Sequence, residues 1–175
     1  DVVLDMCGAP GSKTSHLGIL MNNKGLIDVY DLYPHKAKLI EDNAKRLGLS
    51  NIHVHTGDST DLSLFDNQYT KILLDGPCSG LGVLSRKPEI KYHDSDAMDE
   101  IILIQAKLLE NAYSLCIKGG NIVYSTCTIN KKENEKQIEK FIKKHPDMHV
   151  VEERTILPFE YHSDGFYMCL LEKDV

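Results

Sequence analysis

Residues 2–15 read VVLDMCGAPGSKTS: a short apolar run, then a turn with two glycines, then the start of an amphipathic segment. This order of strand, tight turn and helix is typical of the first unit of an open α/β sheet that binds a nucleotide. A P-loop would need glycine at two positions where Cys7 and Ser12 stand. The dinucleotide pattern G-x-G-x-x-G fails as well, because Gly8 and Gly11 are three positions apart. The turn therefore indicates a compact ligand rather than a pyrophosphate.

Apolar runs alternate with amphipathic segments along the rest of the chain. We expect strands over residues 2–6, 25–30, 52–55, 71–74, 121–125, 149–152 and 166–171. Helices are expected over residues 13–21, 34–47, 99–117 and 132–144, and a long loop over 76–98. Ser12 is the expected N-cap of the first helix, and Gly119 and Gly120 are expected to end the third. The alternation predicts an α/β, doubly wound, Rossmann-like fold with a mainly parallel seven-stranded sheet and an antiparallel C-terminal edge.

Length and composition fit one domain. The chain has 175 residues, 42% of them hydrophobic and 26% charged, and no apolar run approaches the length of a membrane span. Its five cysteines are odd in number and form no C-x-x-C pair, which argues against a disulfide framework or a metal site and indicates a reducing, cytoplasmic setting. A net charge of −6 is unusual for a protein that binds nucleic acid by itself. Because the chain opens directly on a core strand, we expect residues 1–175 to be one domain of a longer protein.

Two carboxylates follow the second and third expected strands. Asp31, in DVYDLY, can accept hydrogen bonds from both ribose hydroxyls of an adenosine, and Asp58, in HTGDST, can reach the adenine amino edge. Either residue alone could be an ordinary polar strand end. Together with the first turn, they predict an adenosine pocket without a phosphate site, which S-adenosylmethionine (SAM) fits better than NAD or ATP.

Two cysteines follow the fourth and fifth expected strands. Cys78 lies in LLDGPCSGLGV (residues 73–83), and Cys127 lies in GGNIVYSTCTINKKENE (residues 119–135). With both strands expected beside the first, the two thiols should face one cleft. Cys116 and Cys169 are expected to be buried core residues, as free cysteines commonly are. The lysine- and glutamate-rich helix over 132–144 is expected to present a solvated face.

The chain resembles the Sun/Nop-type RNA (cytosine-5) methyltransferases. The likeness rests on the segments LDMCGAPGSKT, LLDGPCSGLGV, RKPEIKY and YSTCTINKKENE and extends to the closing DGFYMCLL. The paired Pro-Cys and Thr-Cys motifs make it specific, because DNA cytosine methyltransferases rely on a single Pro-Cys nucleophile. Gly8 and Ser12 stand where alanine and glycine are commoner, and the amino-terminal RNA-binding region of the family is absent from this sequence.

The resemblance implies a reaction and a set of site residues. Cys127 is expected to be the nucleophile that adds to C6 of cytosine, Cys78 to assist product release, and Asp75 to contact the N3/N4 edge of the base. The expected SAM-binding residues are Cys7, Gly8, Ala9, Pro10, Gly11, Lys13, Asp31, Asp58 and Asp75.

The expected partner is RNA, with small-subunit (16S) ribosomal RNA as the substrate and transfer RNA or another ribosomal RNA as alternatives. The target cytosine has to be unpaired or flipped out of its stack. Arg86, Lys87 and Lys91 are the candidate phosphate contacts, although a solvated loop would carry such charges too. Two other classes stay open: a NAD-dependent oxidoreductase, which would leave both strand-end cysteines without a role, and a non-catalytic SAM-fold interaction module.

Overall fold

The computed structural model describes residues 1–92 and 95–175. The chain runs in order through β1 (Val2–Asp5), α1 (Ser12–Leu20), β2 (Leu26–Asp31), α2 (Pro34–Arg46), β3 (Ile52–Thr56), η1 (Leu62–Leu64), β4 (Tyr69–Asp75), η2 (Leu81–Val83), η3 (Pro88–Tyr92), α3 (Ser95–Leu115), β5 (Cys116–Thr126), α4 (Glu135–Lys144), β6 (Met148–Ile156), α5 (Pro158–Tyr161) and β7 (Phe166–Lys173).

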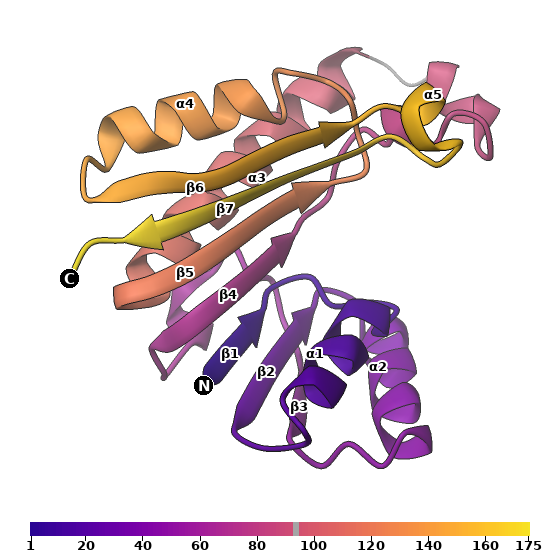
Figure 1. The fold of residues 1–175 in the computed structure, drawn as a ribbon. Helices are drawn as coiled ribbons and strands as arrows, with labels where there is room; N and C mark the ends of the chain where they lie inside the picture. The colour runs from indigo at the N-terminus through magenta and orange to yellow at the C-terminus, as the bar shows by residue number, and fades with distance from the viewer. Residues whose placement is uncertain (93–94) are drawn as a thin grey trace.

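All seven strands form one sheet in the order β3-β2-β1-β4-β5-β7-β6 (Figure 1). The five strands from β3 to β5 are parallel, and β7 pairs antiparallel with both β5 and β6. This confirms the predicted mainly parallel sheet with an antiparallel C-terminal edge. The expected neighbours of the first strand need one correction: β4 lies beside β1, but β5 lies beyond β4. The strand order reverses between β1 and β4, which is where open α/β sheets bind ligands.

Helices pack on both faces of the sheet, as Figure 1 shows. Alternate residues of β1 point to opposite faces, so Val3 joins the apolar cluster beside α1 and α2, while Leu4 joins the larger cluster beside α3 and α4. Cys116 and Cys169 are buried in the larger cluster, as expected. The sheet is therefore doubly wound.

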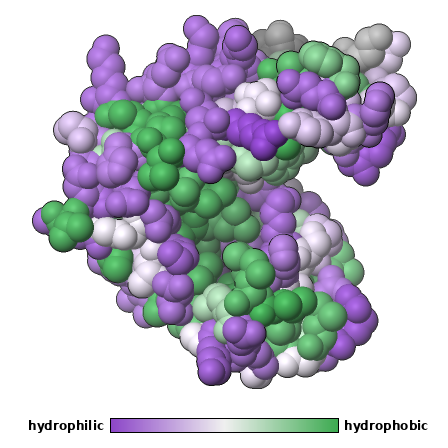
Figure 2. All heavy atoms as spheres, in the orientation of Figure 1, coloured by the Kyte–Doolittle hydropathy of each residue, from purple (hydrophilic) through white to green (hydrophobic). Residues whose placement is uncertain are grey.

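One part of the sheet carries no helix on its α1/α2 side. In the described residues, α1 and α2 cover β1 to β3 only, and β4, β5 and β7 are open on that side (Figure 1). Figure 2 shows hydrophobic residues gathered along the middle of this hollowed face. Val123, Met168 and Leu170, which alternate with buried residues on β5 and β7, are partly exposed.

Some element boundaries differ from the expected ones. Ser12 is the first residue of α1 and not its N-cap, because Gly11, with φ 101°, occupies the cap position. The third helix ends at Leu115, and Gly119 and Gly120 lie inside β5, where the register with β4 is irregular. These two glycines do not end a helix. Because they have no side chains, they let the strand accommodate a bulge.

The helix expected over residues 132–144 is shorter in the structure, and only part of its surface is exposed to solvent. α4 begins at Glu135, and residues 131–134 form turns. Ile138 and Phe141 pack into the larger core cluster, while Glu133 just before the helix is fully buried. β6 is longer than the expected strand over residues 149–152. Among the described residues, no helix has the length and apolarity needed to span a membrane.

Candidate active site

The first turn, between β1 and α1, lies between the carboxyl ends of β1, β2 and β4. Met6 N donates to Leu73 O over 3.0 Å, and Gly8 N donates to Tyr30 O over 3.0 Å. A Cβ atom on Gly8 would lie 2.1 Å from Val29 Cγ2, so a side chain at this position would require the Val29 side chain to shift. The glycines of this turn therefore serve close packing and the start of α1, which explains why they match no phosphate-binding pattern.

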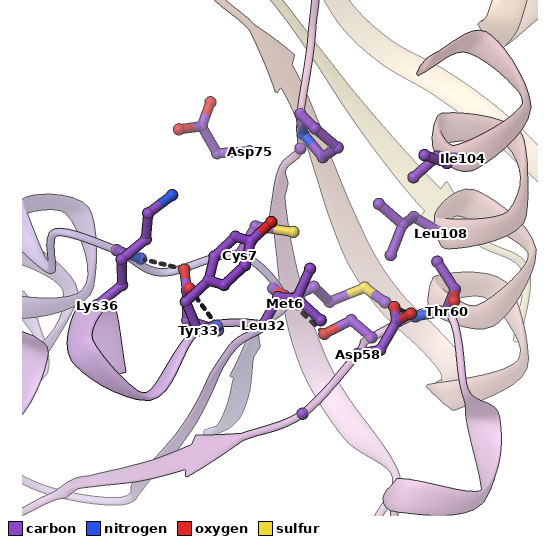
Figure 3. Close-up of a pocket in the computed structure, with 16 residues that line it drawn as sticks. Met6, Cys7, Leu32, Tyr33, Lys36, Asp58, Thr60, Asp75, Ile104 and Leu108 are labelled. Atoms are coloured by element: carbon purple, nitrogen blue, oxygen red, sulfur yellow. Dashed lines mark hydrogen bonds between the residues drawn. The ribbon is translucent and has the colours of Figure 1, made fainter. Parts of the chain in front are cut away.

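A cavity of about 500 Å³ opens beside this turn. Its walls come from the first turn, the loops after β2, β3 and β4, and one side of α3 (Figure 3). Its volume suits a nucleoside-sized ligand. Of the predicted cofactor-binding residues, five line the cavity: Cys7, Ala9, Asp31, Asp58 and Asp75. The other four, Gly8, Pro10, Gly11 and Lys13, lie outside its lining.

Hydrogen bonds from backbone N–H groups hold the two predicted adenosine carboxylates. Asp31 accepts from Ala9 N over 3.3 Å and from Tyr33 N over 3.1 Å, which ties the end of β2 to the first turn. Asp58 accepts from Thr60 N over 2.9 Å. Each carboxylate lines the cavity with unused acceptor capacity.

The cavity also has lining residues that the sequence does not predict, among them Tyr33, Lys36, Ile104 and Leu108. Figure 3 shows Ile104 and Leu108 projecting from α3 toward the cavity, across from Tyr33 and Lys36. The apolar stripe of the third helix was visible in the sequence, but it predicts core packing. Nothing in that stripe indicates that part of it borders a ligand cavity.

Asp75 lies at the cavity wall and is hydrogen-bonded to one residue of α1 and one of β5. Lys13 Nζ donates to Asp75 Oδ2 over 2.6 Å, and Ser125 Oγ donates to Asp75 Oδ1 over 2.7 Å. Lys13 Nζ also lies 5.6 Å from the centre of the Phe166 ring. Lys13 thus contacts a carboxylate at the cavity wall, and Ser125 stands two residues before Cys127 on β5.

The thiols of Cys78 and Cys127 meet. Their Sγ atoms lie 3.2 Å apart, which is within hydrogen-bond distance for sulfur. The hydrogen bond between the two thiols lowers the pKa of Cys127 to about 7, and the same hydrogen bond is the main reason that the pKa of Cys78 is raised. Cys127 is therefore the thiol that is partly ionised near neutral pH, and the thiolate is the reactive form.

Two other ionisable groups of this region are shielded. Burial raises the pKa of Asp5 to about 6, although Thr14 Oγ1 donates to it over 2.6 Å. Burial also raises the pKa of the Cys7 thiol far above its ordinary value. Cys7 lines the cavity, and its raised pKa disfavours the reactive thiolate form.

The turns that carry the two thiols are joined through Gly82. Its N–H donates to Cys127 O over 3.0 Å, and its carbonyl accepts from Gly165 N over 2.8 Å. A Cβ atom on Gly82 would lie 2.1 Å from Gly165 O and 2.7 Å from Cys127 O. The loop after β4, the loop after β5 and the loop before β7 therefore meet backbone to backbone.

The candidate RNA-contacting residues differ in their surroundings. Arg86 pairs with Asp164, with Nε 3.1 Å from Oδ1, and Lys87 is exposed. The side chain of Lys91 lies outside the described residues. The structure thus exposes Lys87 to solvent and engages Arg86 in an ion pair. In the described parts of the chain, no group of three or more His, Cys, Asp or Glu side chains is placed to hold a metal ion.

Comparisons with known proteins agree with this arrangement. Residues 1–172 match the profile of a family described as 16S rRNA methyltransferase RsmB/F. The probable ribosomal RNA small subunit methyltransferase B of Bacillus subtilis is 41% identical over 193 aligned positions, which cover 99% of this chain and 43% of that protein. The protein of the same name from Synechocystis is 35% identical, with 99% and 43% covered. This chain thus spans less than half the length of these relatives.

Solved structures give the same result. The crystal structure of NSun6 from Pyrococcus horikoshii with SFG superimposes with a TM-score of 0.90 at 31% identity. The match covers 99% of this chain and 48% of that one. The two strand-end thiols, the carboxylate-lined cavity and these similarities lead to one conclusion: the chain belongs to the 16S rRNA methyltransferase RsmB/F family.

Proposed function

We propose that residues 1–175 form the catalytic domain of a SAM-dependent RNA methyltransferase that modifies C5 of a cytosine. The observation that carries this proposal is the pair of thiols 3.2 Å apart beside a nucleoside-sized cavity. An oxidoreductase or a non-catalytic module would leave that pair without a role. The presence of SFG, a SAM analogue, in the NSun6 structure supports the choice of cofactor.

The cavity residues fit a methylsulfonium nucleoside. Asp31 would bind the ribose hydroxyls, and Asp58 would accept from the adenine amino group, since both are hydrogen-bond acceptors at the wall. Ile104 and Leu108 offer apolar surface to the adenine ring. When bound, SAM supplies an electrophilic methyl group. Asp75, at the cavity wall, is the carboxylate nearest in sequence to Cys78 and would contact both the cofactor and the N3/N4 edge of the base.

The two thiols then take different parts in the reaction. The Cys127 thiolate adds to C6 of the cytosine, which makes C5 nucleophilic enough to accept the methyl group. After that transfer, the C5 proton has to leave before the bond between Cys127 and C6 can break. Cys78 lies beside Cys127 and would accept this proton as a thiolate, because the hydrogen bond to Cys127 that raises the pKa of Cys78 is lost once Cys127 is bonded to C6.

We propose small-subunit ribosomal RNA as the substrate, because both curated relatives carry that activity in their names. Lys87 and Lys91 remain candidate phosphate contacts, and Arg86 would join them only by leaving Asp164. A reducing, cytoplasmic compartment is consistent with the five free cysteines.

Isothermal titration with SAM and with NAD tests the cofactor. We expect SAM to bind and NAD not to bind, and Asp31→Ala to weaken SAM binding at least tenfold, because it removes hydrogen bonds to a charged acceptor. Asp42→Ala, an exposed change on α2, is the matched control. Tight NAD binding without SAM binding would overturn the proposal. Mapping of 5-methylcytosine in 16S RNA after incubation with SAM tests the target.

A further inference from the structure

Glu133 is a fully buried carboxylate outside the cavity described above. It lies in the turns before α4, within the INKKENE segment that follows Cys127. Burial of a carboxylate is costly unless its oxygens receive hydrogen bonds. A charged side chain in this position therefore needs a structural or functional reason.

Four hydrogen-bond donors surround this carboxylate. Oε1 accepts from Ser79 N over 2.8 Å and from Gln105 Nε2 over 3.0 Å. Oε2 accepts from Ser79 Oγ over 2.5 Å and from Asn130 Nδ2 over 2.9 Å. A carboxylate accepts through both oxygens and donates nothing, so it matches this set of donors.

The donors come from the two turns that hold the thiols. Ser79 directly follows Cys78, and Asn130 lies three positions after Cys127. Ser79 Oγ also lies 2.9 Å from Thr128 Oγ1, which gives the two turns a second direct contact. Both turns are thus fastened to one buried side chain.

The third partner fixes the carboxylate to the helix layer. Gln105 of α3 donates to Pro77 O over 2.9 Å as well as to Glu133, so it reaches the turn on the other side of Cys78. Tyr124 OH donates to the backbone carbonyl of Glu133 over 2.6 Å and ties it to β5. The residues before and after Cys78 are both held by this network.

We propose that Glu133 is a positioning residue that holds the turns of Cys78 and Cys127 together and so sets the distance between the two thiols. Its part in methyl transfer rests on the proposed function, but its effect on the thiols does not. Without the carboxylate, Ser79 and Asn130 lose their common acceptor, and the two turns are free to separate. The hydrogen bond between the two thiols would then be lost.

The reactivity of Cys127 tests this inference. The folded protein is alkylated with iodoacetamide across a pH range, and peptide mass spectrometry after digestion then measures the modification of Cys127. In Glu133→Gln, the glutamine side chain has nearly the same shape as glutamate, but an amide NH₂ group replaces one acceptor oxygen and faces hydrogen-bond donors. We expect the alkylation midpoint of Cys127 to rise from about 7 toward that of an ordinary thiol, so that the rate at pH 7 falls roughly tenfold. Glu139→Gln, the same change at an exposed position of α4, should leave the midpoint unchanged.

Ser79→Ala is the second variant, because it removes one hydroxyl from the network and leaves the other contacts of Glu133 in place. It should shift the midpoint in the same direction by a smaller amount. If Glu133→Gln does not fold, Ser79→Ala decides alone. An unchanged Cys127 midpoint in each folded variant would overturn the inference.

Kinetics separate this inference from the proposed function. For Glu133→Gln we expect kcat for RNA methylation to fall by about 10- to 100-fold, with KM for SAM within about twofold of the original. If Glu133→Gln shifts the alkylation midpoint while the original protein makes no 5-methylcytosine, the positioning role is supported and the proposed function is contradicted. Full methylation activity in Glu133→Gln would contradict the positioning role alone.

Discussion

The Sγ atoms of Cys78 and Cys127 lie 3.2 Å apart, although 49 positions separate the two residues in the chain. The sheet explains the contact. β4 and β5 are neighbouring parallel strands, paired through Asp75 and Ser125 at their carboxyl ends. Each cysteine follows its strand end by a few residues, so the two turns emerge at the same edge.

Replacement of each thiol should give a different result. Cys127→Ala should reduce RNA methylation by about 1,000-fold or more, because no thiolate is left to add to C6. Cys78→Ala should accumulate a covalent complex with RNA, because the step that releases Cys127 is impaired. Denaturing gel electrophoresis with labelled RNA detects that complex. If the complex forms in Cys127→Ala instead, the two roles are reversed.

The pH dependence of Cys127 should depend on its neighbour. The hydrogen bond from Cys78 lowers the pKa of Cys127 to about 7, so alkylation of Cys127 should increase through pH 7 and level off above it. Cys78→Ala removes the donor and should move the midpoint upward. Cys78→Ser retains a donor and should stay nearer the original. Identical profiles in all three proteins would show that the hydrogen bond does not control Cys127.

Asp5 should make folding stability fall as pH rises from about 4 to 6. Burial raises the pKa of this carboxyl from 3.8 to about 6, so the folded protein binds more protons than the unfolded chain within that window. The contribution is present below pH 4 and lost above pH 6, and two pH units correspond to about 3 kcal/mol. Asp5→Asn removes this titration.

Urea unfolding of both proteins at several pH values measures the effect. The free energy of unfolding of Asp5→Asn, relative to the original protein, should increase by about 2–3 kcal/mol from pH 4 to pH 6. The difference isolates Asp5 from the other carboxyls. A relative stability that decreases over this range would show that Asp5 is ionised more easily in the folded state.

Gly82→Ala should destabilise the protein by about 1–3 kcal/mol, because its Cβ would overlap backbone atoms that have little freedom to move. Those atoms are Gly165 O at 2.1 Å and Cys127 O at 2.7 Å. Thermal unfolding measures the loss. Gly76→Ala is the control, since its Cβ would meet Leu74 and Leu108 at ordinary distances of 3.5 and 3.7 Å. Equal stability of the two variants would contradict the close approach at Gly82.

The sequence was most informative where polar residues follow strands. Asp31 and Asp58 are predicted for that reason, Asp75 is predicted from the family resemblance, and all three line one cavity. The cysteines after the fourth and fifth strands were expected to face one cleft, and their thiols meet. The catalytic and binding roles of these residues remain predictions. The parallel part of the sheet makes such reasoning effective, because the carboxyl ends of the parallel strands lie at one edge.

Other features depend on packing that no local pattern reveals. Glu133 lies among lysines and glutamates, a composition typical of a solvated surface, yet the turns around it enclose it completely. Ile104 and Leu108 belong to a helical stripe that also builds the core, so periodicity could not separate core from cavity wall. Ser12 has the side chain of an N-cap, but the left-handed conformation of Gly11 moves the start of the helix by one residue.

The contact between Gly82 and Gly165 limits how this chain can vary through evolution. Each backbone occupies the space that the other's side chain would need, and Gly82 is also bonded to Cys127. A single substitution at either position cannot be compensated by a smaller residue opposite it, because the opposing residue already has no side chain. We therefore expect both positions to remain glycine in descendants that keep their paired thiols, while exposed loop positions nearby diverge.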